Sequence, residues 1–164
     1  MIRPQRIAHV VIKVRDLDRS KRFYQVVLGL DLMGEIDRPR VAFLSANRKD
    51  HHEIGLLEVG AEAPDADSRA VGLVHIAFRL ANEEQLRAAY RELKERSVPV
   101  RSTVDHGVTK SVYFSDPDGN ELEVYSDNSP EEVSRFPNPY AGLDRLDFAP
   151  DDPGLGDIVS TQKL

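Results

Sequence analysis

The chain has no cysteine and no tryptophan among its 164 residues. Without thiols, the sequence excludes disulfide scaffolds, zinc ribbons, iron–sulfur clusters and thiol nucleophiles. Any metal ion must therefore bind through histidine, carboxylate or backbone oxygen. At this length, 40% hydrophobic residues can build the core of a single domain without disulfides or a structural metal.

Clustered basic residues and long apolar runs are also missing. The formal net charge is −6, and lysine and arginine are spread along the chain, which argues against a nucleic-acid partner. No run approaches the roughly 18 apolar residues of a membrane-spanning helix. The N-terminal string MIRPQR leads into no apolar signal core. We therefore expect a soluble, cytoplasmic protein with no membrane partner.

The same order of predicted elements occurs twice along the chain. Each half begins with a strand, over 6–14 or over 72–80, continues into a helix and ends with about three short strands. An offset of 66 residues superposes two pairs of residues, His9 on His75 and Tyr24 on Tyr90. This repetition predicts a duplicated module.

Each half has one predicted amphipathic helix. In the first half, Asp16 or Asp18 caps a helix that Gly29 ends. Its apolar residues at helical spacing are Phe23, Val26, Val27 and Leu30. In the second half, the predicted helix covers 82–96, and its apolar face consists of Leu86, Ala89, Tyr90 and Leu93.

The modules and their linker form one predicted domain over residues 1–128. The first module covers about 6–60, a polar linker follows over 61–70, and the second module covers about 71–127. Five of the ten prolines fall in the last 37 residues, which favours an extended or loop-like segment over 129–164. Its scattered aromatic and leucine residues predict packing along the domain or along a partner subunit.

Two histidines at duplicated positions are the main chemical signal. Each lies in a predicted strand and shares a face with apolar neighbours, His9 with Ile7 and Val11, and His75 with Leu73 and Ala77. A single histidine of this kind is more often a core residue than a ligand. If the modules pair about a pseudo-twofold axis, however, the first strands become neighbours and the two imidazoles point inward to one place.

The last predicted strand, with the sequence ELEVYS over 121–126, adds a carboxylate. Alternation along this strand makes either Glu121 or Glu123 available as a third inward group. Two neutral imidazoles and one carboxylate, with coordination positions left open, suit non-haem Fe(II) oxygen chemistry. Mn(II), Ni(II) and Zn(II) occupy similar sites.

This pattern resembles the vicinal oxygen chelate superfamily, which includes glyoxalase I, fosfomycin-resistance enzymes, methylmalonyl-CoA epimerase and type I extradiol dioxygenases. The resemblance covers about residues 6 to 126 and includes the string DPDGNELEVY. It implies an α+β fold in which two βαβββ modules form a curled mixed sheet around a metal, with the helices outside. It also implies that the metal ligands are His9, His75 and Glu123.

Two further strings resemble type I extradiol dioxygenases in particular. His52 in DHHEIGL resembles their acid/base histidine, while His106 and Tyr113 in HGVTKSVYFSDPDGN resemble a pocket histidine and a substrate-binding tyrosine. The resemblance implies an Fe(II) enzyme that cleaves a catechol-like diol with O₂ and forms a homodimer or larger homo-oligomer. Such a site needs a group that exchanges protons with the diol and groups that hydrogen-bond its oxygens. We expect His51 at the surface.

Two alternatives stay open. The string LEV over 57–59 mirrors LEV over 122–124, which makes Glu58 the counterpart of Glu123 by sequence. Glyoxalase I uses a fourth ligand of this kind, so a glyoxalase- or epimerase-like lyase or isomerase is the first alternative. A fourth ligand would occupy a position that dioxygen chemistry needs open. The second alternative is a non-catalytic binding or resistance protein like the bleomycin-binding proteins, against which the intact ligand set argues.

Overall fold

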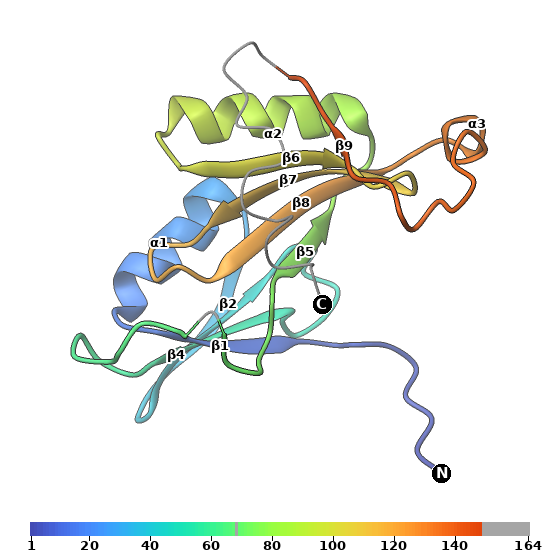
Figure 1. The fold of residues 1–164 in the computed structure, drawn as a ribbon. Helices are drawn as coiled ribbons and strands as arrows, with labels where there is room; N and C mark the ends of the chain where they lie inside the picture. Colours follow the sequence, from blue (N-terminus) through green and yellow to red (C-terminus); the bar gives the residue numbers. More distant parts are fainter. Residues whose placement is uncertain (68, 149–164) are drawn as a thin grey trace. The chain divides into compact units, whose positions relative to one another are not determined.

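The protein has an α+β fold with two mixed β-sheets, as predicted. Figure 1 shows the computed structural model, which describes residues 1–67 and 69–148. The predicted C-terminal segment beyond residue 148 lies outside the described residues. The described part divides into two compact units, the first within 1–69 together with 117–119, the second made of 70–116 and 120–148. No helix of the described part is long and apolar enough to cross a membrane.

The first unit contains a four-stranded sheet and one helix. Its elements in chain order are β1 (Val10–Val14), α1 (Leu17–Val27), β2 (Asp31–Asp37), β3 (Arg40–Ser45) and β4 (Ile54–Glu58). The strand order is β1-β4-β3-β2, with β1 parallel to β4 and the other pairs antiparallel. This is the βαβββ topology that the sequence predicts.

Two carboxylates satisfy the first backbone N–H groups of α1. The Asp16 side chain accepts a hydrogen bond from the Arg19 backbone nitrogen at 3.0 Å. Glu58 Oε2, at the end of β4, accepts one from the Leu17 backbone nitrogen at 2.8 Å. These N–H groups have no partner within a helix, so the two carboxylates determine where α1 begins.

The buried face of α1 differs from the predicted one. It consists of Leu17, Ser20 and Tyr24. Of the predicted residues, Leu30 is buried but lies after the end of the helix. The prediction counted only apolar side chains, whereas two of the three buried helix residues carry hydroxyl groups. Val26, on the predicted face, is 47% exposed.

The second unit repeats this topology and adds a short strand. Its elements are β5 (Ile76–Arg79), α2 (Glu83–Glu95), β6 (Val100–Asp105), β7 (Thr109–Ser115), β8 (Glu121–Asp127), α3 (Pro130–Val133) and β9 (Asp144–Arg145). The strand order is β5-β8-β7-β6-β9, with β5 parallel to β8. Helix α2 lies along one face of this sheet (Figure 1).

Helix α2 follows the sequence prediction closely. The Asn82 side chain caps it by accepting from the Gln85 backbone nitrogen at 3.0 Å. The buried residues are Leu86, Tyr90 and Leu93, at the predicted helical spacing. Burying each such side chain contributes about 1.5–3 kcal/mol, which holds the helix on the sheet.

Strand register allows the two units to be compared residue by residue. Across three strands, the residues in line are Val11, Gly55 and Phe43 in the first unit, and Ala77, Glu123 and Tyr113 in the second. Val11 follows His9 by two residues, and Ala77 follows His75 by two. The two rows therefore occupy equivalent places, and we call them the first-unit row and the second-unit row.

Both first strands begin later than predicted, one residue after their histidine. The histidine-bearing side of β1 is not a buried core face, because Ile7 is 87% exposed and Val11 is 51% exposed. The buried residues of β1 are Ile12 and Val14, on the opposite face. That opposite face is the one that α1 covers, since it also carries Glu58, whose side chain binds the start of α1.

Candidate functional site

The second unit brings together two of the predicted metal ligands. His75 Nε2 lies 3.1 Å from Glu123 Oε2. Glu123 is buried on β8, with 6% of its surface exposed, while His75 precedes β5 and is half-buried. An imidazole nitrogen and a carboxylate oxygen therefore lie side by side, and this donor set fits Fe(II), Mn(II) or Zn(II).

Each member of this pair favours the charged form of the other. Burial by itself raises the pKa of Glu123, but the hydrogen bonds with His75, Ser111 and Tyr113 and the charge of His75 together hold that pKa below its usual value. The hydrogen bond with Glu123 raises the pKa of His75 despite burial. Glu123 is therefore held in its carboxylate form, which is the form that binds a metal ion.

Tyr113 and His106 form a second pair beside the first. Tyr113 lies directly opposite Glu123 in the β7–β8 ladder, and its ring meets the His75 ring edge-on, with 5.5 Å between centroids. Its hydroxyl oxygen is 2.9 Å from His106 Nε2. Burial and the charge of Glu123 raise the pKa of Tyr113 well above its usual value, so the phenol keeps its proton.

The direction of the Tyr113–His106 hydrogen bond follows from a third group. His106 Nδ1 lies 3.2 Å from the Gly142 carbonyl oxygen. A carbonyl oxygen only accepts, so this contact favours the tautomer with the proton on Nδ1, and in that tautomer Nε2 accepts from the Tyr113 hydroxyl. The sequence did not reveal Gly142, because a backbone carbonyl in a loop has no motif.

The first unit brings His9 and His52 together. Their ring centroids are 4.5 Å apart, and the Phe43 ring lies 4.8 Å from that of His52. His51 is exposed, and its Nδ1 is 2.6 Å from His52 Nδ1. Burial, followed by the charges of His51 and His9, lowers the pKa of His52. Its imidazole is therefore neutral near pH 7.

Glu58 is engaged in structural contacts. Besides the Leu17 backbone nitrogen, it accepts a hydrogen bond from Arg40 Nη1 at 2.9 Å. The register pairs Glu58 with Val14, at the end of the parallel β1–β4 ladder. Its carboxylate thus ties the start of α1 to β3 and β4.

The first-unit counterpart of Glu123 is Gly55, so the equivalence of Glu58 drawn from the LEV strings is wrong. Glu123 pairs with Ala77, and Gly55 pairs with the equivalent Val11. The repeated LEV sequence is misleading, because strand pairing decides which residues are structurally equivalent and residue identity does not. A Cβ atom at Gly55 would lie 3.0 Å from Val11 Cγ2, so this position offers no donor and little room for one.

The predicted ligand set is only partly assembled. Within residues 1–67 and 69–148, no group of three or more His, Cys, Asp or Glu side chains is placed to hold a metal ion. His75 and Glu123 are together in the second unit, and His9 belongs to the first. The assignment of His9 as the third ligand stays a prediction.

Comparison with known proteins identifies the family. Residues 6–124 match a family model described as the Glyoxalase/Bleomycin resistance protein/Dioxygenase superfamily. The chain belongs to this superfamily. A biphenyl-2,3-diol 1,2-dioxygenase from Rhodococcus globerulus is 35% identical over 134 residues, which cover 80% of this chain and 69% of that protein. The prediction of the superfamily is thereby confirmed.

The chain is also similar to a second dioxygenase in sequence and to a solved structure in fold. Catechol-2,3-dioxygenase from Bacillus subtilis (strain 168) is 34% identical over 122 residues, which cover 74% of this chain but only 41% of that protein. A crystal structure of a glyoxylase/bleomycin resistance protein/dioxygenase domain from Frankia sp. EAN1pec superposes with a TM-score of 0.69 at 22% identity. It covers 82% of this chain and 100% of that domain, and it shows a shared fold.

Proposed function

We propose that this chain is an Fe(II)-dependent extradiol dioxygenase that cleaves a catechol-like aromatic diol with O₂. The observation that carries the proposal is the pairing of His75 with Glu123 beside the pair of Tyr113 and His106. Metal donors thus lie next to a protonated phenol, and a hydrogen bond with a histidine orients the O–H group of that phenol. The 35% identity to a protein named as a biphenyl-2,3-diol dioxygenase supports the same activity and an aryl-substituted diol as substrate.

His75 and Glu123 would hold the metal, with His9 as the third ligand that the resemblance implies. When bound, Fe(II) would supply the redox chemistry that links the diol to O₂, which redox-inactive Zn(II) does not. Gly55 supplies no further donor at the position equivalent to Glu123. Coordination positions are then left for substrate.

The remaining residues handle protons and orientation. The Tyr113 hydroxyl oxygen can accept a hydrogen bond from a diol hydroxyl while its own proton points to His106 Nε2, 2.9 Å away. This arrangement orients the diol and holds a proton at a defined atom. From its sequence string we assign to His52 the exchange of the diol proton.

The contacts of Glu58 weigh against a glyoxalase- or epimerase-like lyase or isomerase. Its carboxylate already binds the Leu17 backbone and Arg40, and those bonds would break if it became a fourth ligand. The close pairing of His75 with Glu123 weighs in turn against a binding or resistance protein that works without a metal.

The proposal is tested by anaerobic reconstitution with Fe(II), followed by catechol, 3-substituted catechols and biphenyl-2,3-diol in the presence of air. We expect O₂ uptake in step with diol loss and a yellow ring-cleavage product. Protein loaded with Zn(II) is the matched control, and it should bind metal without consuming O₂. No O₂ uptake with any diol, together with turnover of a glutathione hemithioacetal, would overturn the proposal.

A further inference from the structure

We propose that residues 136–146, which we call the C-terminal strap, are a positioning element of the active site. In this proposal the Gly142 carbonyl selects the His106 tautomer that receives the Tyr113 proton. The inference rests on the proposed function for its catalytic consequence. The superfamily match ends at residue 124, so the strap lies beyond the part of the chain that the family model describes.

The strap packs directly on the turn between β6 and β7 that carries His106. A Cβ atom at Gly142 would lie 2.5 Å from the His106 carbonyl carbon and 2.7 Å from the Gly107 nitrogen. A Cβ atom at Gly107 would lie 2.8 Å from the Pro139 carbonyl oxygen and 3.0 Å from the Phe136 ring. Two glycines therefore allow a backbone-on-backbone contact that leaves no room for side chains.

Strand pairing anchors the end of the strap. Strand β9 pairs with β6, so Arg145 lies opposite Val104. The buried Thr103 hydroxyl donates to the Leu146 carbonyl oxygen at 2.7 Å, and the Leu146 side chain is buried. This anchor immediately precedes the His106 turn in β6, so displacement of the strap must disturb that turn.

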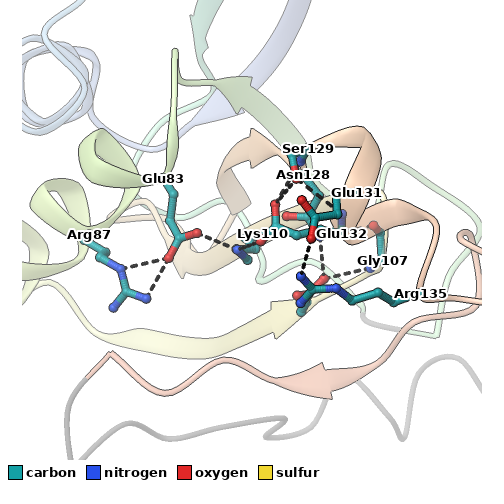
Figure 2. A network of polar contacts seen from close by, with 10 residues as sticks. Glu83, Arg87, Gly107, Lys110, Asn128, Ser129, Glu131, Glu132 and Arg135 are labelled. Carbon is teal, nitrogen blue, oxygen red and sulfur yellow. Dashed lines mark hydrogen bonds and ion pairs between the residues drawn. The ribbon is translucent and has the colours of Figure 1, made fainter.

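Polar contacts anchor the chain that leads into the strap (Figure 2). The Lys110 ammonium group on β7 binds Glu83 of α2 and, at 2.6 Å, Glu132 of α3. Asn128 Nδ2 donates to the Gly107 carbonyl oxygen at 3.1 Å. Because Gly107 lies in the β6–β7 turn and Lys110 follows that turn in β7, these bonds hold the approach to the strap against the same turn.

The Gly142 carbonyl determines which way the Tyr113–His106 hydrogen bond runs. A neutral imidazole carries its proton on one of two nitrogens, and a hydrogen bond at one nitrogen selects the tautomer. With Nδ1–H bound to the Gly142 oxygen, Nε2 accepts from Tyr113. The opposite tautomer would present an N–H to the Tyr113 oxygen and compete with a diol for it. Gly142 is thus a positioning residue that acts through His106.

The first test replaces Gly142 with alanine, whose Cβ must push the carbonyl away from His106. The control is Gly34→Ala, since a Cβ at Gly34 meets nothing within 4 Å. Long-range ¹H–¹⁵N NMR of the metal-free protein reads the His106 tautomer without any turnover. We expect the Nδ1–H form in the wild type and in Gly34→Ala, and a mixture in Gly142→Ala. An Nε2–H form in the wild type would overturn the proposal, whether or not the variant folds.

The second test separates positioning from a general structural effect. In His106→Gln, the amide oxygen can accept from Tyr113 near the former Nε2 place without help from Gly142. In the wild-type background we expect Gly142→Ala to lower kcat about 10-fold, which is the scale of one hydrogen bond. In the His106→Gln background we expect Gly142→Ala to leave kcat unchanged. An equal loss in both backgrounds would contradict the proposal. If the wild type itself shows no dioxygenase activity, the proposed function fails, while the tautomer measurement still decides the role of Gly142.

Discussion

The two units share a topology, but their equivalent rows carry different chemistry. The first-unit row, Val11, Gly55 and Phe43, has no polar side chain. The second-unit row places Glu123 between Ala77 and Tyr113, with His75 next to the carboxylate. The βαβββ scaffold therefore positions a row of residues, and the side chains in that row decide the function.

The equivalent histidines also have different neighbours. His9 lies against His52, a group of the same kind, whereas His75 lies against the carboxylate of Glu123. A carboxylate partner attracts a cation, while a neighbouring imidazole adds only a neutral donor. The second unit should therefore dominate metal affinity, and substitutions there should cost more than their first-unit equivalents.

The largest effect should come from Glu123→Gln, which keeps the side-chain shape but removes the charge of the second-unit row. Mutation of a residue that only hydrogen-bonds to a metal ligand typically lowers metal affinity about 10–100-fold. Loss of the ligand Glu123 itself should therefore lower Fe(II) affinity more than about 100-fold. Anaerobic Fe(II) titration measures it. Unchanged affinity would show that Glu123 is not a ligand.

A smaller effect is expected from Tyr113→Phe, which makes the second-unit row resemble the first, where Phe43 stands. Removing one oriented hydrogen-bonding group at the reacting centre should lower kcat about 100-fold while Fe(II) affinity is retained. Steady-state O₂ uptake gives kcat. A loss of metal together with activity would contradict the role given to Tyr113.

Glu58→Ala tests whether the first unit contributes a ligand at all. The change removes an acceptor for the first N–H group of α1 and the ion pair with Arg40. It should lower the free energy of unfolding by about 1–2 kcal/mol, as loss of a helix cap does. Urea denaturation measures this, and Fe(II) affinity should stay unchanged. A variant of normal stability with weakened metal binding would instead favour the four-ligand alternative.

The smallest effect concerns the ion network of the second unit. Hydrogen bonds from Lys110 and Ser129 lower the pKa of Glu132 to about 2. Since the unfolded-state pKa is about 4.3, this carboxylate stabilises the fold at neutral pH, and its contribution falls as pH drops from about 5 to 2.

Glu132→Gln should accordingly destabilise the protein by about 1 kcal/mol at pH 7, and the difference in Tm from the wild type should shrink on acidification. Calorimetric scans at neutral and acidic pH measure the difference. Glu131→Gln is the control, since the Glu131 side chain is 85% exposed. A Tm difference that stays constant with pH would contradict this role for Glu132.

The sequence predicted the features that depend on local periodicity. Helix α2 was found with its buried face because Leu86, Tyr90 and Leu93 recur at helical spacing beside a capping Asn82. The duplicated order of elements was recognisable because turn residues and apolar runs recur at similar intervals. Alternation left Glu121 and Glu123 both open, and the family resemblance selected Glu123 and Tyr113, which are partners in one antiparallel ladder.

The features that depend on long-range pairing were not predictable in the same way. The offset of 66 residues relates β1 to β5, but Gly55 and Glu123 differ by 68, so the LEV strings aligned Glu58 with the wrong position. The face of α1 that is buried is decided by tertiary packing, which buries the polar Ser20. The contact of Gly142 with His106 involves a backbone oxygen, and every residue type has one, so the sequence gives no sign of it.

Dioxygenase activity is measured most directly as O₂ uptake with a 3-substituted catechol by three Fe(II)-treated proteins: wild type, Glu58→Ala and Glu123→Gln. We expect one O₂ consumed per diol cleaved by the wild type and by Glu58→Ala, and no uptake by Glu123→Gln. A wild type that consumes no O₂ with any diol, but converts a glutathione hemithioacetal in a reaction that Glu58→Ala abolishes, would contradict the dioxygenase function.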